Sequence, residues 1–139
     1  RQHEVIGKKD SEYDGETNPV GRTTSVSQLG YTWEEPASPY NALYPKNHVF
    51  ESESGHIKEY DDTPGFERIH EYHKTGTFYE IDAEGNKTTR VVGNNYEVIV
   101  QNNLVNVKGS VFLTVENDCD TFIKGDLGDQ IGLTRLVLK

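Results

Sequence analysis

Apolar residues become more frequent along the chain. Val, Ile, Leu and Phe occur six times in residues 1–46, seven times in residues 47–90 and twenty times in residues 91–139. The first segment also holds four of the five prolines and several glycines. Such a segment cannot bury enough apolar surface to offset the conformational entropy lost on ordering. The pattern therefore predicts an extended Pro/Gly-rich arm or linker, a β-meander neck and a C-terminal repeat segment.

The arm is predicted to be ordered only where it lies on another surface. Four of its five aromatic residues form a cluster interleaved with prolines, and this cluster is the part most expected to dock. They are Tyr31, Trp33, Tyr40 and Tyr44. The alternative is a flexible linker in which these aromatic residues are incidental.

The neck is predicted to consist of antiparallel strands. Its short apolar runs are separated by sequences such as 61–65 and 83–86, in which Gly and Asn tolerate positive φ and Pro fixes φ. No apolar period of 3.6 residues has a useful length, so helix is predicted to be minor. The predicted strands are 47–53, 56–60, 67–73, 77–82, 87–92 and 96–100.

The C-terminal segment contains an eight-residue repeat, or octad. Every eighth residue from position 91 is aliphatic and β-branched, and Gly, Gln or Asn stands two places after each of the first five. The interior positions are Val91, Ile99, Val107, Val115, Ile123 and Ile131. The corner positions are Gly93, Gln101, Gly109, Asn117 and Gly125, and Leu133 takes this place in the sixth copy.

The octad spacing favours several chains in register over one chain alone. β-branched residues suit extended chain, but one inward residue in eight is too little apolar surface for a single-chain core. Three chains that each present Val or Ile at the same height would fill a narrow axis, and Gly or Asn would turn each corner without a Cβ clash. The alternative is a single-chain β-meander with coincidental spacing.

A stretch of the neck resembles a known family. It runs from Glu53 to His70 and is followed by Gly76-Thr77-Phe78 and the octads. This combination is similar to the C-terminal spike portion of the central baseplate spike, or tail-associated lysozyme, of T-even-like contractile-tailed phages. A looser version is similar to the valine-glycine repeat spike protein of type VI secretion. The residues of this neck motif are Gly55, His56, Asp61, Asp62, Pro64, Gly65, Glu67 and Arg68.

The resemblance implies an all-β fold, in which an antiparallel strand meander leads into a homotrimeric intertwined β-helix, or β-prism. It implies a place in the virion tail baseplate, as a needle driven through the host outer membrane and peptidoglycan. The implied partners are two further copies, the baseplate hub, the N-terminal barrel domain of the same spike and a tip-capping protein.

Two features depart from the family pattern. Neither the barrel nor the helical muramidase domain of such spikes fits in the polar residues 1–46, and the chain begins with Arg and lacks Met, which indicates a fragment or a processed product. The repeat also changes at its end, where Leu127, Leu133 and Leu136 interrupt the pattern. Either this segment closes the tip, or the chain continues in a longer original.

The composition argues against nucleic-acid binding and against a membrane span. The 14 Lys and Arg against 23 Asp and Glu give a net charge of -9, which argues against binding nucleic acid through its phosphates. Hydrophobic residues make up only 33% of the chain, and no apolar run approaches the roughly 18 residues of a membrane span. The low apolar fraction therefore favours burial between chains.

No catalytic, cofactor-binding or metal-binding residue is predicted. His70 and His73 would point to opposite faces of a strand. Adjacent acids in a turn usually form the turn, and Cys119 lies between two aspartates that would raise its thiol pKa. The acid pairs considered are Glu34-Glu35 and Asp61-Asp62.

The prediction is a non-enzymatic, trimeric structural component of a phage baseplate spike, with no cofactor. One alternative is the non-catalytic part of a peptidoglycan-cleaving tail lysozyme whose muramidase domain lies outside this chain. A second alternative is a type VI secretion spike or a trimeric tail adhesin.

Overall fold

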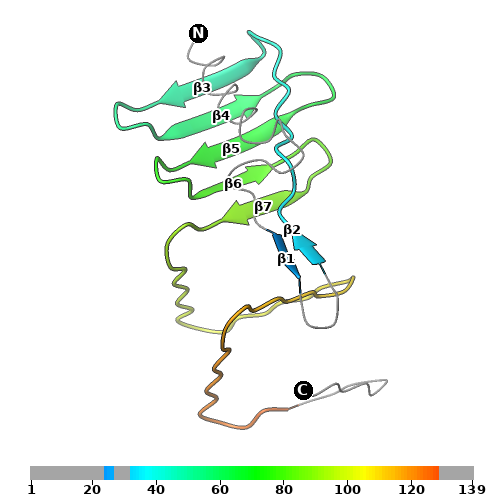
Figure 1. Ribbon diagram of the computed structural model, residues 1–139, viewed down its shortest axis with the longest axis vertical. Coiled ribbons are helices and arrows are strands. Elements are labelled where there is room, and N and C mark those ends of the chain that lie inside the picture. The colour runs from blue at the N-terminus through cyan, green and yellow to red at the C-terminus, as the bar shows by residue number, and fades with distance from the viewer. Residues whose placement is uncertain (1–23, 27–31, 129–139) are drawn as a thin grey trace.

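A computed structural model describes residues 24–26 and 32–128 (Figure 1). This part of the chain is all-β and antiparallel, and it contains no helix. Two short strands pair with each other, and five further strands form one sheet in chain order. The strands are β1 (Thr24–Val26), β2 (Thr32–Glu34), β3 (Asn47–Glu51), β4 (Ile57–Asp61), β5 (Arg68–Tyr72), β6 (Phe78–Ile81) and β7 (Lys87–Arg90). The predicted all-β class and antiparallel meander are confirmed.

Five of the six predicted strands are present, and the sixth prediction is wrong. Residues 96–100 run as exposed chain without a partner strand in the described part. Their alternating apolar pattern is that of a strand, but a strand also requires a neighbour for its backbone groups. Conversely, β1 and β2 lie in the arm where no strand was predicted, because three-residue strands are too short to produce a sequence pattern.

The turns follow the predicted turn chemistry. The described positive-φ residues are all glycines, and each lies in a loop between consecutive strands of the sheet. Gly76 N donates to the His73 carbonyl at 2.8 Å, and Gly85 N donates to the Asp82 carbonyl at 3.0 Å. These turns fix the register of the meander. The glycines are Gly55, Gly65, Gly76 and Gly85.

The two faces of the five-stranded sheet differ. The covered face, defined by Glu59, Arg68, His70 and Glu80, consists of buried side chains. Residues 35–46, which we call the strap, run from β2 past β7 to the start of β3 along this face (Figure 1). On the other face, Phe50, Tyr60 and Ile69 are exposed.

The interior of this sheet is unusually polar. Among the described residues, Ile57 is the only buried hydrophobic side chain. Eight polar or charged residues are buried with it, and they lie on the strap, on strands β3 to β6 and in the β4–β5 turn. The strap covers this face and so buries its charged groups. Buried charges are costly unless they are paired, so the strap can stay in place only if these groups have partners. These residues are Glu35, Asn47, Glu59, Asp61, Thr63, Arg68, His70 and Glu80.

Residues 91–128 leave β7 as extended, exposed chain that runs away from the sheet (Figure 1). The backbone bends at 92–93, 100–101, 108–109, 116–117 and 124–125. These bends recur every eight residues, and each includes one position of the octad corner. The described chain therefore has the same period in its backbone as in its sequence.

Candidate functional site: the covered face of the sheet

Arg68 is the centre of the covered face. It begins β5, and its side chain is fully buried between acids from the two neighbouring strands. Its Nη1 donates to Glu80 Oε2 on β6 at 2.6 Å, and its Nη2 donates to Glu59 Oε1 on β4. A planar guanidinium can bridge two carboxylates in this way. The cluster thus ties together the three central strands of the sheet.

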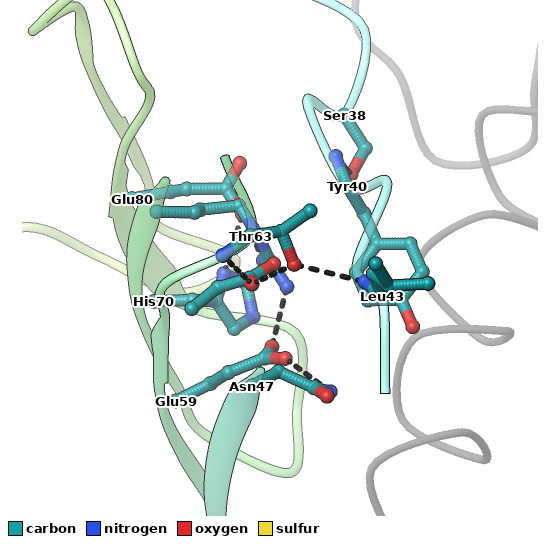
Figure 2. Close-up of polar contacts among 10 residues, drawn as sticks. Ser38, Tyr40, Leu43, Asn47, Glu59, Thr63, His70 and Glu80 are labelled. Atoms are coloured by element: carbon teal, nitrogen blue, oxygen red, sulfur yellow. Dashed lines mark hydrogen bonds and ion pairs between the residues drawn. The ribbon is translucent and has the colours of Figure 1, made fainter. Parts of the chain in front are cut away.

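His70 and Asn47 extend this cluster (Figure 2). The Nδ1 atom of His70 lies 2.8 Å from Glu80 Oε2, and Asn47 Nδ2 donates to Glu59 Oε2 at 3.1 Å. Burial would raise the pKa of the Glu80 carboxyl. However, the hydrogen bond with His70 and the charges of Arg68 and His70 outweigh burial, and the pKa lies below its usual value. Glu80 is therefore held as a carboxylate.

The turn between β4 and β5 connects the sheet to the strap. Asp61 Oδ1 accepts hydrogen bonds from the Thr63 backbone N–H at 3.0 Å and from the Thr63 hydroxyl at 2.6 Å. Thr63 Oγ1 in turn accepts a hydrogen bond from Leu43 N on the strap at 2.8 Å (Figure 2). Asp61 therefore fixes the hydroxyl that receives the strap.

Two further contacts fasten the strap along its length. The Arg68 guanidinium lies 4.9 Å from the centre of the Tyr40 ring, which is a cation–π distance. Nearer β2, Glu35 is buried and its carboxylate lies 3.6 Å from Arg90 on β7. The strap is thus held mainly by polar and charged groups. Both acids that contact Arg68 are buried and ion-paired with it. The arrangement therefore holds the strap and the sheet in one geometry.

The residues considered for catalysis are separated by the fold. Asp61 is buried, whereas Asp62 is exposed and lies 3.3 Å from His48. Glu34 is exposed, whereas Glu35 contacts Arg90. Neither acid pair forms a shared pocket.

The remaining candidates are also separate. His70 belongs to the covered face, whereas His73 is exposed beyond β5 and its ring lies 4.5 Å from that of His56. Cys119 is exposed. Within 24–26 and 32–128, no group of three or more His, Cys, Asp or Glu is arranged to hold a metal ion.

The neck motif has mixed placements. Arg68 and Asp61 lie in the buried network, while Gly55 and Gly65 provide positive φ in turns. Pro64 and Glu67 are exposed, Asp62 contacts His48, and His56 accepts a hydrogen bond from Lys74 N at 3.2 Å.

Sequence reasoning missed Glu59 and Glu80, which are essential to the network. The available signal was the placement of titratable residues at alternate positions, 59 and 61 in one predicted strand region and 68 and 70 in the next. A polar face of this kind is ordinarily interpreted as solvent-exposed, and the strap that covers it could not be placed from sequence.

The octad interior residues are the least exposed apolar residues of residues 94–128. Ile99, Val107, Val115 and Ile123 are 45–49% exposed, and the other large apolar side chains there are 70–92% exposed. Val91 is 39% exposed, and Ile131 lies outside the described residues. The sequence also contains a second set of large apolar residues spaced eight residues apart, which was not predicted. It consists of Tyr96, Leu104 and Phe112.

The corner glycines are not constrained by their own chain. Gly93, Gly109 and Gly125 do not have positive φ, and a Cβ atom at each would meet no described atom within 4 Å. Gln101 and Asn117 lie at the same bends. The proposed avoidance of a Cβ clash at the corners therefore concerns neighbouring chains and stays a prediction.

No helix of the described residues is long and apolar enough to cross a membrane. No protein-family model matches the chain. Relatives among known proteins nevertheless identify its class.

The chain is homologous to baseplate central spike proteins of phage tails. It is 40% identical over 131 residues to protein Gp5 of Vibrio phage KVP40, across 94% of this chain and 30% of that protein. It is 47% identical over 66 residues to the pre-baseplate central spike protein Gp5 of Enterobacteria phage T4, across 48% of this chain and 12% of that protein. The chain spans less than a third of the length of these relatives. The resemblance to baseplate spikes is thereby confirmed, and the homology supports a structural role in the virion tail baseplate.

Proposed function

We propose that this chain forms the stem of a trimeric baseplate spike, a needle that penetrates the host outer membrane during infection. The observation that carries the proposal is the backbone bend that recurs every eight residues in step with the β-branched octad. Homology to Gp5 proteins supports the spike assignment.

The backbone of residues 93–128 has no backbone partner among the described residues. The apolar side chains of this segment are largely exposed. Backbone groups and apolar surface of this extent need partners. Three chains wound about one axis would supply both, because each chain would pair with its neighbours and direct its interior residues inward.

The five-stranded sheet has two edges that pair with no other described strand. Strands β3 and β7 are its outermost strands, and open edges invite further pairing. In the proposed trimer, β7 is continued by the intertwined β-helix formed by residues 91–139. A closed ladder of this kind resists bending, and stiffness is what a needle requires.

The proposed stem has a partner at each of its two ends. The arm of residues 1–46 would connect the stem to the N-terminal barrel domain and the baseplate hub, and a tip-capping protein would bind the far end. The relatives are more than three times as long as the matched region, which leaves room for further domains in the parent protein. A muramidase domain there remains the alternative that a zymogram of the intact parent would test.

Sedimentation equilibrium of the 139-residue chain tests the proposal. We expect a particle of three times the 15.7 kDa chain mass. Val107→Asp, at an octad interior position, should weaken the trimer, whereas Ser110→Asp, between interior positions, should leave it intact. A wild-type chain that stays monomeric would contradict the proposal.

A further inference from the structure

Two buried oxygen atoms of the covered face accept no hydrogen bond from the described part of the chain. They are Asn47 Oδ1 and Asp61 Oδ2, and both residues are 2% exposed. Asn47 begins β3, Asp61 ends β4, and the two are directly opposite each other in the antiparallel register. Side chains at such paired positions lie next to each other on one face of a sheet. The two oxygens therefore belong to one place in the fold.

The surrounding contacts fix which atoms are left over. Asn47 Nδ2 donates to Glu59 Oε2 at 3.1 Å (Figure 2), and because a carboxylate can only accept, the Asn47 amide cannot be turned the other way round. Asp61 Oδ1 already accepts two hydrogen bonds from Thr63. A buried acceptor without a partner costs the chain its full desolvation, so the two remaining oxygens call for a positively charged or hydrogen-donating ligand.

The charge of the buried cluster favours a cation as this ligand. Three carboxylates of the sheet are buried with one guanidinium, that of Arg68. Arg68 is opposite Asp61 in the register, but its Nη atoms bind the other two acids. A proton on His70 would reduce the excess negative charge by one, but it would lie beside Glu80. A water molecule could satisfy the two oxygens but would leave the charge of Asp61 uncompensated. The three acids are Glu59, Asp61 and Glu80.

We propose that Asn47 Oδ1 and Asp61 Oδ2 bind a hard divalent cation of the calcium type. Calcium is bound by carboxylate, amide and carbonyl oxygens in flexible geometry, whereas magnesium demands a regular octahedron and gives up its waters reluctantly. Two oxygens closed off from solvent therefore suit calcium better. With one carboxylate this site differs from the groups of three or more ligands considered above, and we expect a dissociation constant of about 10⁻⁴–10⁻³ M.

A cation at this place would reinforce the attachment of the strap. Asp61 fixes the hydroxyl of Thr63, which accepts a hydrogen bond from Leu43 N of the strap. Asn47 is the first residue after the strap. A cation that joins Asn47 to Asp61 would thus link the end of the strap to the turn that receives it. Both ligands come from one chain, so the site goes beyond the proposed spike function and does not depend on the number of chains.

Equilibrium dialysis of the full chain tests the proposal. After treatment with a chelator, the wild type should take up one calcium ion per chain at about 2 mM calcium chloride, with the ionic strength held constant by choline chloride. Asp61→Asn should bind calcium at least tenfold more weakly, because the only carboxylate of the site is neutralised. Asp62→Asn is the matched control, since it removes the same charge from the exposed neighbouring residue, and it should bind like the wild type.

A wild type that takes up no calcium would overturn the proposal. Equal uptake by Asp61→Asn and the wild type would also overturn it, because the ions would then be held only by the net charge of -9. If Asp61→Asn does not fold, Asn47→Ala removes the other oxygen and should also weaken binding. A monomeric chain that binds calcium would overturn the proposed function alone, and a trimer that binds none would overturn this inference alone.

Urea unfolding provides a second measurement that a merely structural role of Asp61 would not reproduce. In Asp61→Asn the new amide can donate to Asn47 Oδ1 while its oxygen still accepts from Thr63. Without calcium, this variant should therefore unfold at a urea concentration equal to or above that of the wild type. Calcium should raise the midpoint of the wild type and of Asp62→Asn but not of Asp61→Asn, since only a ligand of the folded state stabilises it. An equal rise with magnesium or potassium chloride would contradict the assignment to calcium.

Discussion

At the scale of single residues, Arg68 decides whether the covered face can exist. Its guanidinium neutralises two buried carboxylates from the flanking strands, and it lies beneath Tyr40 of the strap. A buried ion cluster is weak evidence for stability, since apolar residues can often replace it as a whole. Removing one member is different, because the others are then left charged and buried.

Arg68→Met should therefore destabilise the folded protein by about 3–5 kcal/mol, because Glu59 and Glu80 lose their shared counter-charge. Arg90→Met is the control, since Arg90 is partly exposed and lies 3.6 Å from Glu35, and such a pair is worth at most about 1 kcal/mol. Denaturant unfolding followed by circular dichroism at fixed protein concentration measures both. Equal losses in the two variants would show that Arg68 is not the centre of the network.

Acid should weaken the same network in a defined range. The pKa of Glu80 lies below its usual value of 4.5, so the unfolded chain binds this proton more readily than the folded chain. The stabilising contribution is thus complete above about pH 4.5 and is lost as the pH falls through the lower pKa of the folded state. Unfolding free energies measured down to about pH 3 should fall less steeply in Glu80→Gln than in the wild type. The same change at exposed Glu67 should preserve the wild-type slope, and a Glu80→Gln slope equal to that of the wild type would contradict this assignment.

At the scale of elements, the strands of the neck were predictable and the strap was not. Turn sequences with Gly, Asn and Pro bound each strand, and four glycines have the positive φ that such turns use. Tyr40 was among the aromatic residues expected to dock, and its ring does lie over Arg68. Trp33 and Tyr44, however, are 42% and 54% exposed, and Tyr31 lies outside the described residues.

The buried network could not be predicted because its signal is ambiguous. Glu59, Arg68 and Glu80 lie on one face of three neighbouring strands, and a charged face is typical of exposure to solvent. Only the strap, held by side-chain contacts distant in sequence, makes this face an interior. The error at residues 96–100 has the converse cause, since an apolar alternation was present but the partner strand was not.

At the scale of the whole molecule, the chain covers one face of its sheet with its own strap and leaves most of its apolar side chains exposed. Paired charges hold the strap on the covered face, whereas the opposite face of the sheet and residues 91–128 leave their large apolar side chains exposed. The low hydrophobic fraction of 33% is consistent with this division, since a chain that shares its core with copies of itself needs less apolar surface of its own.

The charge of the assembly leads to a prediction about membranes. At -9 per chain, the proposed trimer would carry -27, so it should be repelled by anionic lipid and should cross a membrane only when force drives it. The assembled chain should therefore not co-sediment with anionic phospholipid vesicles and should release no trapped dye from them. Vesicles of neutral lipid are the control, because they separate charge repulsion from a lack of apolar insertion. Tight binding to anionic vesicles, or dye release without applied force, would mean that the chain inserts into membranes by itself and would contradict a purely mechanical action.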